Sequence, residues 1–110
     1  VSATFEPIIE RAMRDLPFDF QISTRMKVNY DGTYACEVDG VPVEGDRKMI
    51  ELRRFANAKW GEGGWDLAAS YGDHHSDRAL LAGAKQGFAV CPDRPLGRTA
   101  RERGYQVLEW

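Results

Sequence analysis

The chain has 110 residues, enough for one small domain and too few for a second. Its composition is that of a globular protein, because 43% of the residues are hydrophobic and 29% are charged. The net charge of -2 argues against broad binding to nucleic acid, which needs a basic surface. No stretch approaches 18 consecutive apolar residues and no signal-peptide pattern is present, so we expect a soluble, cytoplasmic protein with no membrane partner.

The first part of the chain predicts a helix followed by a β-hairpin. Thr4 is a plausible N-cap of a helix whose apolar residues recur at helical spacing and which ends before Pro17. Residues 18–28 and 33–38 alternate in polarity and are rich in β-formers. The dipeptide Asp31-Gly32 between them favours a turn with positive φ, so the two segments are expected to pair as a hairpin.

The rest of the chain alternates helices and strands. We expect helices over residues 45–60, 76–85 and 95–103, and strands over residues 65–71, 88–91 and 106–110. Strand, helix and strand at this spacing imply right-handed crossovers and a parallel sheet. The predicted fold class is therefore α/β, with the hairpin beside the sheet.

Several polar segments are expected at one edge of this sheet. In parallel α/β sheets, chemistry lies beyond the carboxyl ends of the strands, where loops lead into helix N-termini. The segments Ser2-Ala3-Thr4 and 72–77 are predicted to reach that edge, and Lys48 can point to it. Hydroxyl and backbone N–H groups at 2–4 suit a phosphate, and Lys48 could neutralise one. The alternatives are a simple helix cap at 2–4 and a solvated lysine.

The stretch SYGDHHSD, residues 70–77, raises the question of a metal. Asp73 and Asp77 follow a strand directly, and such carboxylates can bind Mg²⁺ together with water and substrate phosphate. The alternative for Asp73 is a helix cap near Ser76. His74 and His75 are adjacent and expected to point in different directions, and the chain has no other histidine, so zinc is not predicted. The histidines are either solvated or, for His74, near the substrate.

The two cysteines do not change this interpretation. Cys36 and Cys91 lie far apart in the sequence and form no C-x-x-C pair. In a cytoplasmic protein they are expected to be free thiols, buried or half-buried. The sequence therefore predicts neither a disulfide framework nor a cysteine-based metal site.

Taken in order, the stretches VSATF, EGDRK and YGDHHSD, followed by AVCPDRPL, resemble the haloacid-dehalogenase (HAD) superfamily and most closely its phosphoserine-phosphatase-like branch, subfamily IB. The resemblance covers the whole chain and implies a partial HAD-like Rossmannoid three-layer core. It implies that Ser2, assisted by the amides of Ala3 and Thr4, holds the transferring phosphoryl group and that Lys48 balances its charge. It further implies that Asp73 ligates Mg²⁺ and that Asp77 supports the metal site and the lysine.

The chain also departs from the family pattern. Motif I, an Asp-x-Asp-x-Thr stretch that supplies the nucleophile, is absent, so residues 1–110 look like the C-terminal part of a HAD core without its cap. The resemblance implies that the intact protein hydrolyses a small-molecule phosphomonoester through an aspartyl-phosphate, with the N-terminal half in the same or another chain. The isolated chain is then expected to be inactive. The alternative is a non-catalytic binding or regulatory module that kept the fold.

Overall fold

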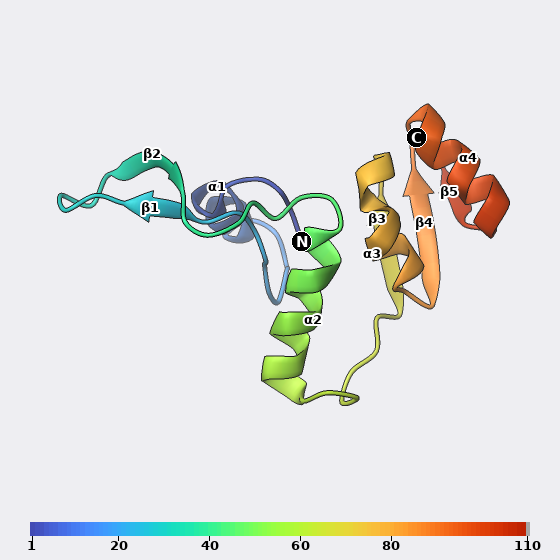
Figure 1. Ribbon diagram of the computed structural model, residues 1–110, viewed down its shortest axis with the longest axis horizontal. Coiled ribbons are helices and arrows are strands. Elements are labelled where there is room, and N and C mark those ends of the chain that lie inside the picture. Colours follow the sequence, from blue (N-terminus) through green and yellow to red (C-terminus); the bar gives the residue numbers. More distant parts are fainter. Residues whose placement is uncertain (110) are drawn as a thin grey trace.

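The computed structural model describes residues 1–109, and Trp110, the end of the last predicted strand, lies outside the described residues. Its elements are α1 (Glu6–Met13), β1 (Met26–Val28), β2 (Tyr34–Val38), α2 (Arg47–Trp60), β3 (Ala69–Gly72), the 3₁₀ turn η1 (His75–Asp77), α3 (Arg78–Ala82), β4 (Gln86–Val90), α4 (Arg94–Arg103) and β5 (Gln106–Leu108). In Figure 1, α1 and the hairpin lie at one end, the sheet with α3 and α4 at the other, and α2 between them. The α/β class is confirmed.

The three strands of the second half form the predicted parallel sheet. Their order is β3-β4-β5, and both neighbouring pairs run parallel. The core of this part joins Leu81 of α3 and two residues of α4, Leu96 and Ala100, to Ala89 of β4. Because Ala89 meets residues from both helices, α3 and α4 cover the same face of the sheet, as consecutive right-handed crossovers in one direction require.

The opposite face of the sheet carries aromatic side chains. Side chains alternate along a strand, so Tyr71 and Phe88 point away from the face that Ala89 shares with the helices. Their rings stack with centroids 4.7 Å apart, and Tyr71 is 58% exposed. The sheet therefore presents an apolar, solvent-exposed surface on this side.

The hairpin is also confirmed, but much of the predicted first strand pairs elsewhere. Strands β1 and β2 are antiparallel, and Gly32 in their turn has φ +87°. Residues 22–24 instead run beside residues 2–5: the Ser2 N–H donates to the Ile22 carbonyl and the Thr24 N–H to the Thr4 carbonyl. Thr4 is thus in an extended pairing and does not cap α1. The N-cap is Phe5, and α1 ends at Met13, well before Pro17.

Two further predictions were wrong in detail. The helix expected over 76–85 is a 3₁₀ turn followed by the short α3, which ends at Gly83. A Cβ on Gly83 would lie 2.8 Å from the Met49 methyl carbon, so the Met49 side chain of α2 packs closely against the backbone at the end of α3. Both cysteines are free, as expected, but Cys36 and Cys91 are exposed instead of buried. Within residues 1–109, no helix has the length and apolar character needed to cross a bilayer.

Thr24 holds the segment before α1 to the rest of the N-terminal part. Its side chain is buried, with 1% of the residue exposed. The hydroxyl donates to the Ala3 carbonyl (2.9 Å) and accepts from the Val43 N–H (3.0 Å). One hydroxyl therefore satisfies two backbone groups that are distant in the sequence, and it fixes the position of Ser2 and Thr4.

We expect Thr24→Val to lower the free energy of unfolding by about 1–3 kcal/mol, because it leaves the Val43 N–H and the Ala3 carbonyl without their partner in a buried position. Urea unfolding followed by tryptophan fluorescence measures the change. Thr24→Ser, which keeps the hydroxyl, is the matched control and should cost clearly less. Equal costs for the two variants would show that these hydrogen bonds do not stabilise the fold.

Candidate functional site

The centre of the candidate site is an ion pair between two elements far apart in the sequence. Lys48 lies in the first turn of α2, and Asp77 ends the 3₁₀ turn η1. The Lys48 Nζ is 2.7 Å from the Asp77 Oδ1, and the two side chains are 17% and 5% exposed. Removing two charges from water costs free energy, which is recovered only when the two groups are close and well oriented. Buried ion pairs of this kind are found preferentially at functional sites.

Gly72, the last residue of β3, leaves the space that the Asp77 side chain occupies. A Cβ on Gly72 would lie 2.8 Å from the Asp77 Cβ and 3.0 Å from its Oδ2, closer than side chains tolerate. The Asp77 N–H donates to the His74 carbonyl (2.9 Å), which closes the turn. The glycine and the tight turn together direct the carboxylate toward Lys48.

Asp73 lies in the same turn, directly after β3, and it is exposed. Its backbone carbonyl accepts a hydrogen bond from the Asp93 N–H (3.0 Å). The capping alternative is wrong for Asp73, because the residue that caps η1 is His74, whose ring accepts the Ser76 N–H. The Asp73 carboxylate is therefore not explained by helix capping.

The segment Ser2-Ala3-Thr4 reaches the neighbourhood of Lys48. The N-terminal residue lies beside the start of α2, where Lys48 is located, near enough for its charge and that of the Lys48 ammonium to interact (Figure 1). The Ser2 hydroxyl accepts a hydrogen bond from the Thr4 N–H (3.1 Å). The structure thus brings Lys48 and Asp77 into contact and the hydroxyl-bearing segment close to them.

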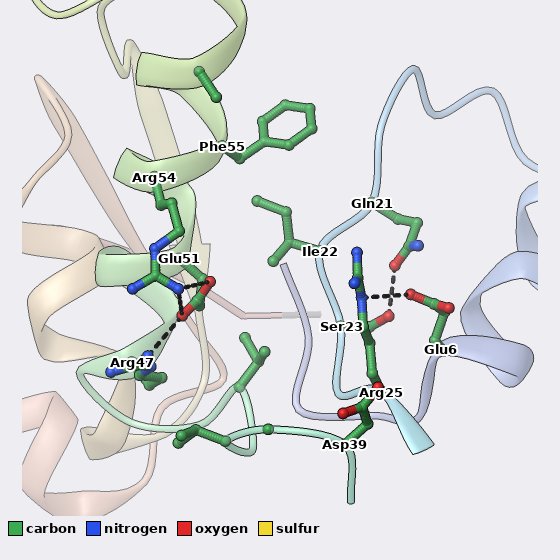
Figure 2. A pocket seen from close by; sticks show the side chains of 14 residues that line it. Glu6, Gln21, Ile22, Ser23, Arg25, Asp39, Arg47, Glu51, Arg54 and Phe55 are labelled. Carbon is green, nitrogen blue, oxygen red and sulfur yellow. Dashed lines mark hydrogen bonds and ion pairs between the residues drawn. The ribbon is translucent and has the colours of Figure 1, made fainter. Parts of the chain in front are cut away.

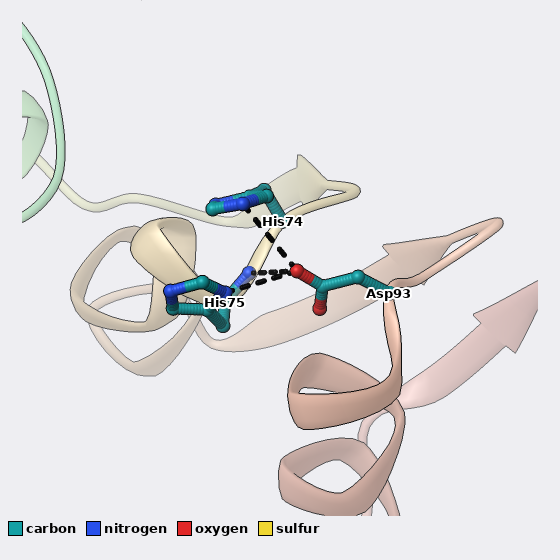
Figure 3. Close-up of side chains that lie close together, drawn as sticks. All are labelled: His74, His75 and Asp93. Atoms are coloured by element: carbon teal, nitrogen blue, oxygen red, sulfur yellow. Dashed lines mark hydrogen bonds and ion pairs between the residues drawn. The ribbon is translucent and has the colours of Figure 1, made fainter.

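The two histidines do not point in different directions, as their adjacency had suggested. Their ring centroids are 4.1 Å apart with a tilt of 35°, because the 3₁₀ turn begins between them. Both rings approach Asp93, with the Oδ2 atom 3.0 Å from the His75 Nδ1 and 3.5 Å from the His74 Nε2 (Figure 3). The sequence interpretation missed Asp93, although its place just before a Pro-containing helix start is typical of an N-cap.

The surroundings of Asp93 favour its charged form. Partial burial raises the pKa of its carboxyl, but hydrogen bonds from the His75 ring and from the N–H groups of Leu96 and His75, together with the nearby His74, outweigh this, and the pKa falls to about 2. The Oδ1 atom accepts the Leu96 N–H at 2.9 Å and so caps α4. Asp93 therefore links α4 to the turn that carries Asp73 and Asp77.

A cavity of about 540 Å³ lies elsewhere, between α2 and the segments that contain Gln21 and Asp39 (Figure 2). Its arginines are matched by acids: Arg47 and Arg54 contact Glu51 at 3.0 and 3.1 Å, and Arg25 lies 3.5 Å from Glu6. None of the predicted site residues lines it. Each of its three arginines thus has an acidic partner within the protein, and Arg47 and Arg54 share the one Glu51 carboxylate.

Comparison with known proteins supports the family suggested by the motifs. The model of the family described as "HAD: haloacid dehalogenase-like hydrolase" matches residues 1–82. The "Inhibition of morphological differentiation protein" of Streptomyces azureus is 31% identical over an alignment covering 100% of this chain and 39% of that protein. The histidinol-phosphatase of Neisseria meningitidis serogroup C (strain 8013) is 29% identical over 100% of this chain and 50% of its own length. The chain thus spans half or less of these curated relatives.

Two solved structures share the fold. A protein of unknown function from Bordetella pertussis Tohama I superposes with a TM-score of 0.87 at 24% identity, covering 98% of this chain and 48% of that one. A HAD family hydrolase from Salmonella enterica serovar Typhi superposes with a TM-score of 0.72 at 17% identity, covering 98% and 35%. At these identities the likeness concerns the fold alone.

Proposed function

Because this chain belongs to the haloacid dehalogenase-like hydrolase family, we propose that it supplies the phosphate- and metal-binding half of a phosphomonoester hydrolase. The observation that carries the proposal is the buried pair of Lys48 and Asp77, with 2.7 Å between Nζ and Oδ1, beside an exposed Asp73. The match to a histidinol-phosphatase along the whole chain supports a phosphatase reaction. The order of the motifs supports the phosphoserine-phosphatase-like branch.

We propose that residues 1–110 are the C-terminal part of a HAD core and that the nucleophile strand and cap belong to another segment, in the same or a second chain. The lengths of the curated relatives support this, since the chain covers 39% and 50% of them. The exposed Tyr71, stacked on the half-buried Phe88, supports it as well, because an apolar sheet face is normally covered by a further layer. The isolated chain, without the nucleophile, is then inactive.

The acids of the 72–77 turn suit Mg²⁺, the cation that HAD hydrolases generally use. Mg²⁺ prefers oxygen ligands and is often held by one or two carboxylates with waters completing its shell. Because the Asp77 carboxylate is already paired with Lys48, the exposed Asp73 carboxylate would be the ligand of the ion. Asp77 would lie next to the metal site and hold Lys48 in place. Bound there, the ion would offset negative charge on the transferring phosphoryl group.

The remaining residues would position the phosphoryl group. The Lys48 ammonium, fixed by Asp77, balances its negative charge without having to reorganise. The Ser2 hydroxyl and the Ala3 amide would orient the phosphoryl oxygens, the Thr4 N–H would hold the Ser2 hydroxyl to which it donates, and His74 would contact the substrate. An aspartate outside residues 1–110 attacks phosphorus, the ester P–O bond breaks and the alcohol leaves, and water then hydrolyses the aspartyl-phosphate.

The experiment is a phosphatase assay of the intact gene product with p-nitrophenyl phosphate and histidinol phosphate, with and without Mg²⁺. We expect Asp73→Asn to lower kcat/KM by at least about 100-fold, since a metal ligand is lost and several kcal/mol of charge stabilisation with it. Asp66→Asn is the matched control. Asp66 is an aspartate with a 73% exposed side chain that pairs only at the surface with Lys85, and its loss should leave the rate unchanged.

Full activity of Asp73→Asn would contradict the assignment of the metal ligand. An intact gene product without an upstream Asp-x-Asp-x-Thr stretch, which binds Mg²⁺ and phosphate but turns over no phosphomonoester, would contradict the phosphatase and favour the non-catalytic module.

A further inference from the structure

We propose that His74, His75 and Asp93 form a second metal site, separate from the oxygen site proposed at Asp73, and that it takes a divalent transition cation such as Zn²⁺. The three residues come from the 72–77 turn and from the N-cap of α4, which the parallel sheet places side by side. The proposed phosphatase reaction uses neither Asp93 nor His75, and only His74 is shared with its proposed substrate contact.

The geometry of the cluster fits a small cation. One ligand atom from each residue lies within 4.8 Å of the other two. The Asp93 Oδ2 is 3.0 Å from the His75 Nδ1 and 3.5 Å from the His74 Nε2 (Figure 3). Tetrahedral zinc with bonds of about 2.0–2.1 Å holds its ligand atoms about 3.3–3.4 Å apart. The two distances to Asp93 bracket this value, so a cation can be bound here once the ligand atoms, now within 4.8 Å of one another, draw together around it.

The His74 ring nitrogen that does not face Asp93 also has a suitable partner. The His74 Nδ1 accepts the Ser76 N–H (3.2 Å) and lies 2.9 Å from the Ser76 Oγ. When the Nε2 binds a cation, the ring proton moves to Nδ1, which then gives up the hydrogen bond from the Ser76 N–H and donates to the Ser76 hydroxyl instead. A histidine ligand usually donates its second N–H to such an acceptor, which fixes the ring. Ser76 thus orients His74 as a metal ligand.

Asp93 is held in place before any ion arrives. Its Oδ1 accepts the Leu96 N–H at the start of α4, which leaves Oδ2 toward the rings. The side chains of His74, His75 and Asp93 are 55%, 45% and 29% exposed, so water can complete the coordination. Two imidazoles and one carboxylate select a borderline transition metal over Mg²⁺, which prefers oxygen ligands alone.

The test is a calorimetric titration of the intact gene product with Zn²⁺ alone. We expect one zinc per chain, and we expect the affinity to fall at least about tenfold in His74→Ala, His75→Ala and Asp93→Asn, because loss of even an outer partner costs about 10–100-fold. Asp93→Asn keeps an N-capping side chain for α4 and is the variant least apt to unfold. Circular dichroism checks that each variant is folded. Asp73→Asn and Cys91→Ser are the controls and should bind zinc as the parent does.

Three results would overturn the proposal. The first is no binding of zinc by the parent chain, and the second is unchanged affinity in a folded Asp93→Asn. The third is loss of zinc binding in Asp73→Asn with no effect of the histidine variants, which would place zinc in the oxygen site. Titration with Co²⁺ gives an independent reading, since a cysteine ligand would add a thiolate charge-transfer band that nitrogen and oxygen ligands lack.

Discussion

Replacing Lys48 with methionine is expected to lower the free energy of unfolding by about 3–5 kcal/mol. The reason is that the Asp77 side chain, 5% exposed, would keep its charge in a nearly dry position with no partner. Since small domains are stable by only about 5–15 kcal/mol, a change of this size is a large part of the total. Urea unfolding monitored by tryptophan fluorescence and by circular dichroism measures it.

The same substitution at an exposed pair is the control. Lys27 lies 3.2 Å from Glu37, but their side chains are 53% and 69% exposed, so Lys27→Met should cost less than about 1 kcal/mol. Lys48→Met combined with Asp77→Asn should be less destabilised than Lys48→Met alone, because no buried charge then remains. Equal costs at positions 48 and 27 would show that the 48–77 pair is not a buried one.

Adding a single methyl group at Gly72 is expected to cost about 3 kcal/mol. The new Cβ of Gly72→Ala would lie 2.8 Å from the Asp77 Cβ, and its neighbours are the carboxylate itself and not a flexible chain end. Overpacking of a closed position costs about 1–3 kcal/mol, and displacement of Asp77 also weakens its contact with Lys48. Thermal unfolding by circular dichroism reports the loss.

Gly97→Ala is the matched control for this experiment. Gly97 lies inside α4, and a Cβ there would come no closer than 4.0 Å to Pro92. Alanine is the better helix former by about 1 kcal/mol, so this variant should be as stable as the parent or more stable. If Gly72→Ala were as stable as Gly97→Ala, Asp77 would not occupy the position that the structure gives it.

Much of the fold could be predicted because it depends on short-range patterns. The parallel order of β3, β4 and β5 follows from alternating strands and helices, and the hairpin follows from Asp31-Gly32 between two alternating segments. The long helix α2 follows from its apolar periodicity. Each of these signals lies within about twenty residues of sequence, where local spacing and turn chemistry decide the structure.

The contacts that could not be predicted join residues distant in the sequence. The Thr24 hydroxyl bonds the backbone of Ala3 and Val43, 21 and 19 positions away, and no local pattern marks such a partner. Asp93 lies 18 positions from His75, so its approach to the rings depends on how α4 docks on the sheet. Lys48 and Asp77 are also distant in the sequence, 29 positions apart. Residue spacing alone therefore could not predict their contact, and only the resemblance to the family motifs indicated that both belong to one site.

The measurement that tests the account most directly is a crystal structure of the intact gene product with Mg²⁺ and tungstate as a phosphate mimic. We expect Mg²⁺ bound by the Asp73 carboxylate, with the oxyanion in contact with the Lys48 ammonium and the Ser2 hydroxyl. We also expect the contact between Lys48 and Asp77 to be kept. An oxyanion bound away from Lys48, or Mg²⁺ held without Asp73, would contradict the proposed site.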